Sequence, residues 1–371
     1  MSVHELALQR TKYKHLTDDE WRWFLQQVEG RERTADKLPT FAAIDDWWYP
    51  VRLSCEQCSS ELTATYKASL VSGNSMVDLT AGYGVDTYFL SQQFKSADYV
   101  EQNAELCRIA EHNFGIRSQE SGIKIHNTTA EEFLASAGLY DLIFLDPARR
   151  DNHGGKVFRL ADCTPNVVTL LPTLLAHLTK EGRLMLKLSP MLDLTQAVKE
   201  LSAVNWDIHI VAVKNEVKEV LLLSGGKGTI TAIDLEKKDQ AFVFTKEEEK
   251  NAPSSFPLSS FTFLYEPNAA ILKAGAYKLV AARFGLQKLD VNTHLYASEE
   301  LVPNFPGRVW AIKEIINHTF EIKNANVVCR NYPLTPEQVK KKFRIKDGGE
   351  NYIIGCRIAG QPTLWIGERI Q

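Results

Sequence analysis

Hydrophobic residues recur at helical spacing over residues 21–28, near the start of the chain. Thr17 and Glu20 have the spacing of a capping box, which predicts that this helix begins there. The aromatic run at residues 47–49 would either pack this helical part on the next domain or stack on nucleic-acid bases. Over residues 61–228 short apolar runs alternate with stretches of helical periodicity. This alternation predicts strands and helices in turn, and therefore a mostly parallel sheet.

Seven apolar runs in this second region have the length of strands. They lie at residues 76–79, 99–101, 123–127, 142–145, 183–188, 209–213 and 220–223. The last two runs follow each other without a helix between them. We therefore expect an α/β fold with a doubly wound sheet and a helix-free return at its end.

The pattern changes again after residue 228. A charged segment at residues 246–255 is typical of a linker or hairpin tip, and residues 269–284 predict a helix. The last segment predicts a helix at residues 335–343. It also predicts three strands, at residues 327–330, 352–358 and 363–370. The chain is therefore expected to have four parts: a helical cap (1–60), an α/β domain (61–228), a small α/β or linker module (229–300) and a C-terminal α+β domain (301–371).

The first predicted strand leads into a glycine-rich turn. Asp78 ends the strand, and Gly82 and Gly84 allow the backbone to approach a ligand closely. Thr87 stands where the dinucleotide fingerprint has its third glycine. A carboxylate before the turn would repel a pyrophosphate but attract a cationic ligand that carries an amino-acid group. S-adenosylmethionine is such a ligand, while a tight turn without any ligand is the alternative.

A second carboxylate ends the next strand. Glu101 follows Asp78 by 23 residues, close to the roughly twenty residues that separate a glycine turn from a ribose-binding acid. A carboxylate can accept hydrogen bonds from both ribose hydroxyls. By itself Glu101 would be a solvated charge, but together with the turn it predicts a ribose ligand.

The strand at residues 142–145 delivers Asp146 and Pro147 to its carboxyl end. Open α/β sheets bind ligands at this edge, and the proline stiffens the turn and leaves carbonyl groups free to face a substrate. An ordinary Asp-Pro turn is the alternative. After the two earlier elements, the pair predicts an active site in which Asp146 orients a nucleophile and takes its proton.

Three basic residues lie after this loop or on the next strand: Arg149, Arg150 and Lys187. Guanidinium and ammonium groups bind phosphate oxygens, so we expect these residues to hold a substrate phosphate. Ion pairs with Asp141, Asp151 or Glu219 are the alternative.

The composition is that of a globular protein, with 44% hydrophobic and 24% charged residues. The N-terminus lacks an apolar signal region, and the most apolar stretch, residues 167–178, is too short to span a bilayer. We therefore expect a cytoplasmic protein without a membrane partner.

Cys55 and Cys58 form a lone CxxC without a second pair or nearby histidines, so we expect free thiols and no metal.

Charge is distributed unevenly along the chain. The whole chain has a net charge of −3, whereas residues 301–371 contain eleven basic and six acidic residues. The densest basic run contains Lys340, Lys341, Lys342 and Arg344. Such a run can follow a phosphate backbone, and a solvated helix face is the alternative.

These motifs together resemble a known family. D-x-T-x-G-x-G from Asp78 resembles the first motif of class I S-adenosylmethionine-dependent methyltransferases. The sequence D-P-A-R-R from Asp146 is similar to the active-site loop of a bacterial group of these enzymes. Y-E-P-N from Tyr265 and R-N-Y-P-L from Arg330 resemble the ferredoxin-like and THUMP-like regions that end the chains of that group.

The resemblance implies a Rossmann-like methyltransferase domain that uses S-adenosylmethionine. The residues that it implies for cofactor binding are Asp78, Thr80, Ala81, Gly82, Gly84, Asp86, Glu101, Gln102, Glu131 and Lys67. It implies Asp146 and Pro147 as catalytic residues. The implied substrate-binding residues are Arg149, Arg150, Lys187, Lys340, Lys341, Lys342 and Arg344.

THUMP domains accompany RNA-modifying enzymes, which implies tRNA or rRNA as the substrate. Relatives that methylate nucleobase amines carry proline and an aromatic residue after Asp-Pro, where this chain has Ala148 and Arg149. Stacking on the base by that aromatic residue is therefore lost. The alternatives are a methyltransferase of a protein or small molecule and a non-catalytic RNA-binding protein that responds to S-adenosylmethionine. The sequence predicts no particular oligomeric state.

Overall fold

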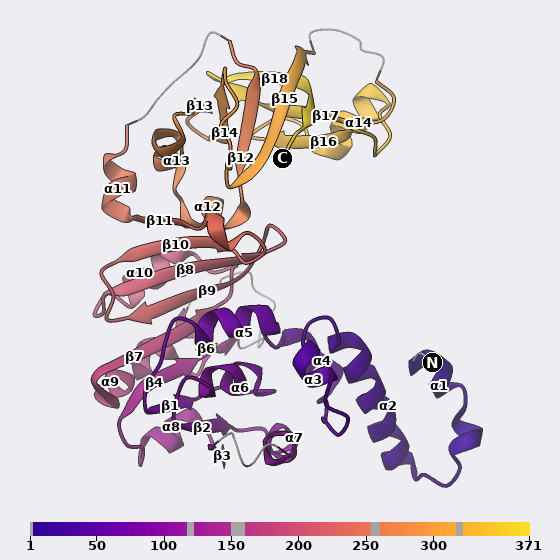
Figure 1. Cartoon of the computed structure of the whole chain (residues 1–371), viewed down its shortest axis with the longest axis vertical. Helices are drawn as coiled ribbons and strands as arrows, with labels where there is room; N and C mark the ends of the chain where they lie inside the picture. The colour runs from indigo at the N-terminus through magenta and orange to yellow at the C-terminus, as the bar shows by residue number, and fades with distance from the viewer. Residues whose placement is uncertain (1–2, 117–121, 150–159, 254–259, 317–321) are drawn as a thin grey trace. The chain divides into compact units, whose positions relative to one another are not determined.

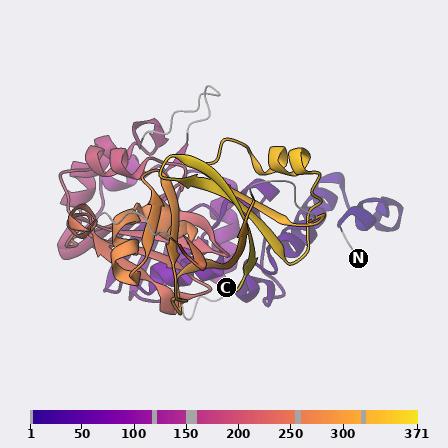
Figure 2. The ribbon, with the colours of Figure 1, turned by 90° about the horizontal axis from the view of Figure 1, so that it is seen from above.

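The computed structural model describes residues 3–116, 122–149, 160–253, 260–316 and 322–371 (Figures 1 and 2). The chain divides into two compact units. The first unit comprises residues 1–206 and 221–226, and the second comprises residues 207–220 and 227–371.

The predicted helical cap is present at the start of the first unit. Its helices are α1 (Val3–Ala7), η1 (Arg10–Tyr13), α2 (Asp18–Thr34), α3 (Pro39–Ala42) and α4 (Arg52–Gln57). The capping box is confirmed, because Glu20 N donates to Thr17 Oγ1 (3.2 Å) and Thr17 N donates to the Glu20 carboxylate (2.7 Å). Trp47 is buried and donates from Nε1 to the hydroxyl of Tyr83 at 2.9 Å. The indole of Trp48 stacks on His112 with ring centroids 3.6 Å apart. The aromatic run therefore packs the cap on the following domain.

A nine-stranded sheet follows, in the order β11-β10-β8-β9-β7-β4-β1-β2-β3. Its strands are β1 (Ser75–Asp78), β2 (Ser96–Glu101), β3 (Ile123–Asn127), β4 (Tyr140–Leu145), β7 (Leu178–Leu188), β8 (Trp206–Val213), β9 (Glu216–Ser224), β10 (Thr229–Asp234) and β11 (Phe242–Thr245). All seven expected strands are present, and β10 and β11 continue the sheet beyond residue 228. The strands β3, β2, β1, β4 and β7 pair in parallel. The chain reverses its direction of progress between β1 and β4, which is the topological switch point of a doubly wound sheet.

Helices alternate with these strands as the periodicity predicts. They are α5 (Glu61–Ala68), α6 (Val85–Ser91), α7 (Ala104–Gly115), α8 (Ala130–Leu134), α9 (Val167–Ala176) and α10 (Leu194–Glu200). A small antiparallel pair, β5 (Ala148–Arg149) and β6 (Cys163–Thr164), follows the Asp-Pro turn. Cap and sheet share one core, in which Phe41 and Tyr49 lie in the same cluster as Met76 and Phe144.

The second unit contains a seven-stranded sheet in the order β13-β14-β12-β15-β18-β17-β16. Its strands are β12 (Phe263–Pro267), β13 (Gln287–Asp290), β14 (Thr293–Ser298), β15 (Gly307–Ile315), β16 (Asn326–Arg330), β17 (Asn351–Ile358) and β18 (Gln361–Arg369). Helix α14 (Pro336–Phe343) lies between β16 and β17 in the chain. The helix and three strands predicted for the last segment are thus confirmed.

Two expectations for the second unit are wrong. The single helix expected at residues 269–284 is two helices, α12 (Ala269–Ala274) and α13 (Tyr277–Phe284), because Gly275 adopts a φ of +80° and ends the first one. The segment expected to be a linker or hairpin tip contains the helix α11 (Lys246–Asn251). A capping box between Thr245 and Glu248 begins it.

None of the helices in the described part of the chain combines the length and the apolar surface needed to cross a bilayer.

Candidate active site

A cavity of about 320 Å³ opens in the first unit where β1, β2 and β4 end. This is the carboxyl edge of the sheet at the switch point, where doubly wound sheets bind ligands. Its wall includes residues 78–86 of the glycine turn, residues 128–131 at the start of α8, and Asp146 after β4. The cap and β6 also contribute to the wall. These contributions are Ser54, Gln57, Cys58 and Ser59 from the cap and Thr164 and Pro165 from β6 and the residue after it.

The glycine turn is held in a conformation that other residues resist. Gly82 and Gly84 have φ values of +57° and +82°. A Cβ atom on Gly84 would lie 2.8 Å from Cζ of Phe114, so this position has no room for a side chain. Gly84 N donates to the carbonyl of Ala81 at 2.8 Å, and Gly84 is the N-cap of α6. The turn therefore presents backbone to the cavity at the start of a helix.

Asp78 is almost fully buried beneath this turn. Its Oδ1 accepts a hydrogen bond from Thr80 N at 3.0 Å, and its Oδ2 accepts one from the hydroxyl of Thr87 at 2.7 Å. Burial raises the pKa of Asp78 to about 7, although these hydrogen bonds act in the opposite direction. Thr87 occupies the third glycine position of the dinucleotide fingerprint, and its hydroxyl orients the carboxylate.

Glu101 joins the end of β2 to the glycine turn. Its Oε2 accepts from Gly82 N at 3.0 Å, and its Oε1 accepts from Asn103 N at 2.8 Å. Each carboxylate oxygen can accept a second hydrogen bond. Glu101 is therefore fixed in place by the backbone and retains acceptor capacity at the cavity wall.

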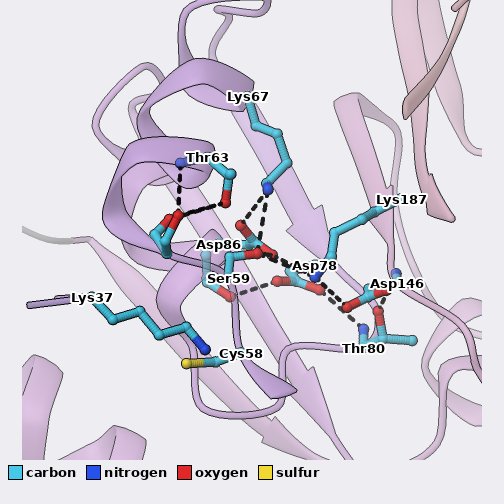
Figure 3. Close-up of polar contacts among 12 residues, drawn as sticks. Lys37, Cys58, Ser59, Thr63, Lys67, Asp78, Thr80, Asp86, Asp146 and Lys187 are labelled. Atoms are coloured by element: carbon cyan, nitrogen blue, oxygen red, sulfur yellow. Dashed lines mark hydrogen bonds and ion pairs between the residues drawn. The ribbon is translucent and has the colours of Figure 1, made fainter. Parts of the chain in front are cut away.

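Four side chains of alternating charge are joined by successive ion pairs (Figure 3), and three of them line the cavity. We call Lys67, Asp86, Lys187 and Asp146 the charged row. Lys67 Nζ lies 3.2 Å from Asp86 Oδ1, and Lys187 Nζ lies 3.3 Å from Asp86 Oδ2 and 2.5 Å from Asp146 Oδ2. The hydroxyl of Ser59 donates to Asp86 Oδ2 at 2.7 Å and accepts from Lys187 Nζ at 3.1 Å. Burial alone would raise the pKa of Asp86, but the two ammonium groups lower it to about 2.

The two ends of the charged row differ in exposure. Lys67 has a fully buried side chain, whereas the side chain of Asp146 is 38% exposed at the cavity. Asp146 N donates to Thr80 Oγ1 at 2.6 Å, so the end of β4 is tied to the glycine turn. The carboxylate that we expect to be catalytic thus lies on the same cavity as the cofactor-binding motif.

The structure brings most of the predicted site residues together. The residues predicted to bind the cofactor that line the cavity are Asp78, Thr80, Ala81, Gly82, Gly84, Asp86, Glu101, Gln102 and Glu131. Lys67 lies behind this wall, against Asp86. Asp146 and Lys187 line the cavity, and Pro147 follows Asp146 without being part of the wall.

The described part of the chain does not show the other predicted substrate residues at the cavity. Arg149 belongs to β5, and Arg150 lies outside the described residues. Lys340, Lys341 and Lys342 lie in α14, and Arg344 is its C-cap, all in the second unit.

Sequence reasoning missed most of the contribution of the cap to the cavity wall. The hydroxyl run at Ser59 and Ser60 was the one signal in this segment. It predicted a helix start that would suit the carboxylate of the ligand's methionine end, with helix capping alone as the alternative. Ser60 is indeed the N-cap of α5 and accepts from Thr63 N at 3.2 Å, while Ser59 joins the charged row. Cys58 lines the cavity, and burial raises the pKa of its neighbour Cys55 to about 12.

Among the described residues no group of three or more His, Cys, Asp or Glu side chains is arranged to hold a metal ion.

Comparison with known proteins places the chain in a family. The structure is similar to the crystal structure of a protein from Porphyromonas gingivalis W83 that is assigned as a methyltransferase. The two share 33% sequence identity over 96% of this chain and 92% of that chain, with a TM-score of 0.84. The chain belongs to the same family of methyltransferases.

Two further comparisons agree with this methyltransferase assignment. Residues 263–306 of the methyltransferase match a ferredoxin-like domain, and residues 307–369 match a THUMP domain-like region. Two uncharacterized S-adenosylmethionine-dependent methyltransferases from two strains of Mycobacterium tuberculosis are each 19% identical to it over 354 residues, 91% of this chain and 92% of theirs. The cofactor is S-adenosylmethionine, as the glycine turn predicts.

Proposed function

We propose that this methyltransferase modifies structured RNA, either tRNA or rRNA. The observation that carries the proposal is the THUMP-like region at residues 307–369 in the same chain as a methyltransferase site. THUMP domains accompany RNA-modifying enzymes, so this region supports an RNA substrate by analogy.

The surface of the THUMP-like region adds a physical reason. Lys341 and Lys342 are exposed on α14, and Arg344 is exposed directly after it. Lys340 contributes less free charge, because its ammonium lies 2.7 Å from the carboxylate of Asp347. Exposed cations of this kind attract a phosphate backbone.

The donor groups of the cavity suit S-adenosylmethionine. We assign Glu101 to the ribose hydroxyls, because both of its oxygens retain acceptor capacity. We assign Asp78 and the turn at Gly82 and Gly84 to the methionine part, because a carboxylate suits the ammonium group and a glycine turn at the start of a helix suits the carboxylate group. We assign the adenine contact to Gln102 and Glu131, because both line the same cavity.

The cofactor would supply a methyl group on a sulfonium, whose methyl carbon a well-placed nucleophile can attack directly with the neutral thioether as leaving group. The task of the protein is therefore to position the acceptor, to exclude water and to remove one proton. We assign proton removal to Asp146, which lies at the cavity, and orientation of the acceptor to Asp146 together with the carbonyl of Pro147.

A transfer experiment tests the proposal. Purified protein and S-adenosylmethionine with a labelled methyl group are mixed with RNA, protein and small-molecule fractions from cells that lack the protein. We expect label in the RNA fraction, and we expect Asp146→Ala to lower single-turnover transfer about a hundredfold while S-adenosylhomocysteine still binds. Label in the protein or small-molecule fraction alone would overturn the proposal.

A further inference from the structure

Two sequence motifs that the cofactor cavity does not explain meet in the second unit. The motif Y-E-P-N lies at the end of β12, and the motif R-N-Y-P-L starts with Arg330, the last residue of β16 (Figure 1). Nε of Arg330 donates to one carboxylate oxygen of Glu266 in the first motif. Nη2 of Arg308, near the start of β15, lies against the other oxygen. We call Glu266, Arg308 and Arg330 the arginine cluster.

The arginine cluster joins the two regions that precede and include the end of the chain. Glu266 belongs to the ferredoxin-like match, and both arginines belong to the THUMP domain-like match. The strands β12 and β16 are not neighbours in the order of the sheet, so the ion pair between Glu266 and Arg330 spans the sheet rather than one strand pair. Side chains from three strands thus meet at one place on this unit.

The carboxylate of the arginine cluster is buried, whereas its guanidinium groups reach the surface. The side chain of Glu266 is 2% exposed, that of Arg308 is 27% exposed and that of Arg330 is 43% exposed. A buried carboxylate needs a cationic partner, and one guanidinium is enough for that. Within the described ranges, Glu266 is the one carboxylate that forms an ion pair with either arginine. The second guanidinium therefore adds a positive charge at the surface that the fold does not require.

The contacts of the cluster also fix the direction of both guanidinium groups. Arg330 donates from Nη1 to the carbonyl of Cys329 at 2.9 Å, in addition to its bond to Glu266. Cζ of Arg308 lies 5.5 Å from the ring centroid of the buried Trp310. A guanidinium has five N–H donors in one plane, and these partners use only some of them. Because the planes are already held, little side-chain freedom is left to lose when a further acceptor binds.

We propose that the arginine cluster is a binding site for phosphate groups of an RNA backbone. The site rests on the proposed RNA function and deepens it, because it names residues other than those of α14 that would hold the substrate. Phosphate oxygens accept hydrogen bonds from guanidinium groups in a forked geometry. A phosphodiester also carries one negative charge, which matches the one cation in excess in the cluster.

Each arginine can be replaced alone, because the other one still pairs with Glu266. Arg308→Gln and Arg330→Gln should each weaken RNA binding about three- to fivefold at about 0.15 M salt, the effect of one lost phosphate contact. The log–log salt slope should become shallower by about 0.7 to 0.9 in each variant. Filter binding of bulk tRNA and rRNA from cells that lack the protein, at several salt concentrations, measures both effects. Wild-type affinity and slope in both variants would overturn the site.

Arg283→Gln is a matched control in the same unit. Arg283 on α13 is 35% exposed and forms an ion pair with Glu248, so the substitution makes the same change of charge at a similar exposure. It should leave the affinity and the salt slope near wild type. A loss as large as that in Arg330→Gln would mean that RNA responds to the overall charge alone, which would overturn the site.

Arg330→Lys separates charge from packing. Lysine keeps the positive charge and an ion pair with Glu266, so the salt slope should stay near wild type and the affinity should fall less than in Arg330→Gln. Equal losses in Arg330→Lys and Arg330→Gln, with the same change of slope, would place the effect in the packing of the sheet. That result would overturn a phosphate-binding role.

Steady-state methyl transfer distinguishes substrate binding from catalysis. Arg330→Gln should raise KM for RNA and leave kcat and the affinity for S-adenosylhomocysteine near wild type, because the wall of the cavity lies within the first unit. A lower kcat at unchanged KM would overturn the site. So would unchanged RNA binding in Arg330→Gln together with loss of binding to poly-glutamate, since the cluster would then hold an acidic protein segment. Label in the protein or small-molecule fraction alone would overturn the RNA function together with this site, whereas labelled RNA with unchanged salt slopes would overturn only the site.

Discussion

Asp78 is the residue of the site whose ionisation changes near neutral pH. Its pKa is raised from 3.8 to about 7 by burial, and an ammonium group binds the ionised form. Below about pH 7 the ligand has to displace a proton, so affinity for S-adenosylhomocysteine should fall by up to about tenfold per pH unit. Calorimetry between about pH 5 and 7.5 measures this slope, and Asp78→Asn should lower the affinity and flatten the slope.

The unliganded protein should show the opposite dependence. A carboxyl group whose pKa is raised by folding binds its proton more tightly in the folded state, so its contribution to stability is lost as pH rises through about 7. Thermal unfolding of the unliganded protein should therefore begin at a lower temperature at pH 8 than at pH 6, and less so in Asp78→Asn. Affinity for the ligand that does not change with pH would contradict the assignment of Asp78 to its ammonium group.

Glu101 provides a second prediction at the scale of one residue. The two carboxylate oxygens of Glu101 accept hydrogen bonds from Gly82 N and Asn103 N. Glu101→Gln replaces one of these acceptors with an NH₂ group and removes the negative charge. Affinity for S-adenosylhomocysteine should weaken by about 1–3 kcal/mol, measured by calorimetry. Glu105→Gln is a matched control, because Glu105 is exposed on the adjoining helix α7 and pairs with Arg108. Equal affinities for the two variants would remove Glu101 from the ribose site.

At the scale of the element, the two glycines of the turn should respond differently to substitution. Both have positive φ values, so Ala at either position introduces strain of about 1–2 kcal/mol. At Gly84 the added Cβ also meets Phe114 at 2.8 Å, whereas at Gly82 the nearest atom is the Thr80 carbonyl oxygen at 3.9 Å. Chemical denaturation should therefore show a larger loss of stability for Gly84→Ala than for Gly82→Ala. A larger loss of stability for Gly82→Ala than for Gly84→Ala would mean that Phe114 moves aside without a cost in stability.

The strands could be predicted because each is a short apolar run, and three of them lead to acids of the cavity wall, Asp78, Glu101 and Asp146. The break at Gly275 was missed because Ala-rich and Leu-rich sequence continues on both sides of it, and a single glycine is tolerated within many helices. The N-terminal cap was predicted as a domain, but of its residues on the cavity wall only Ser59 had been considered as part of a ligand site. Ser54 and Gln57 belong to no motif, and tertiary packing alone brings them to the cavity wall.

The partners of Lys187 show the same limit of sequence reasoning. Asp141 was a candidate ion-pair partner, but it lies at the amino end of β4, where it accepts from Thr179 Oγ1 at 2.7 Å and from Asn74 N at 2.7 Å. Lys187 lies near the carboxyl end of β7 and meets Asp146 instead. Spacing along the chain does not show which end of a strand a side chain can reach. The phosphate-binding roles expected of Arg149, Arg150 and Lys187 stay predictions.

At the scale of the whole molecule, the basic surface of α14 should govern RNA affinity without affecting the cofactor. Lys341→Glu with Lys342→Glu reverses two exposed charges. RNA binding should weaken, and the log–log salt slope should become shallower by about 0.7 for each lost phosphate contact on single-stranded segments. Filter binding at several salt concentrations measures both effects.

Lys237→Glu with Lys238→Glu is a control with the same change of charge at exposed positions of the second unit. It should leave the affinity and the salt slope near wild type. S-adenosylhomocysteine should bind both double variants equally, since the cavity lies within the first unit. An unchanged salt slope in the Lys341 and Lys342 variant would exclude α14 as an RNA-binding surface.

The cap residues at the cavity should couple local opening of the cap to ligand binding. Ser54, Gln57, Cys58 and Ser59 form part of the cavity wall, and hydrogen bonds such as that from Trp47 to Tyr83 hold the segment before them. A ligand that contacts this wall binds only when the cap is docked, so by mass action it stabilises the docked state. Local opening of α4 should then become rarer as the cofactor concentration rises, and its amide hydrogens should exchange more slowly with solvent. The cap and the methyltransferase fold would respond to the cofactor as one cooperative unit.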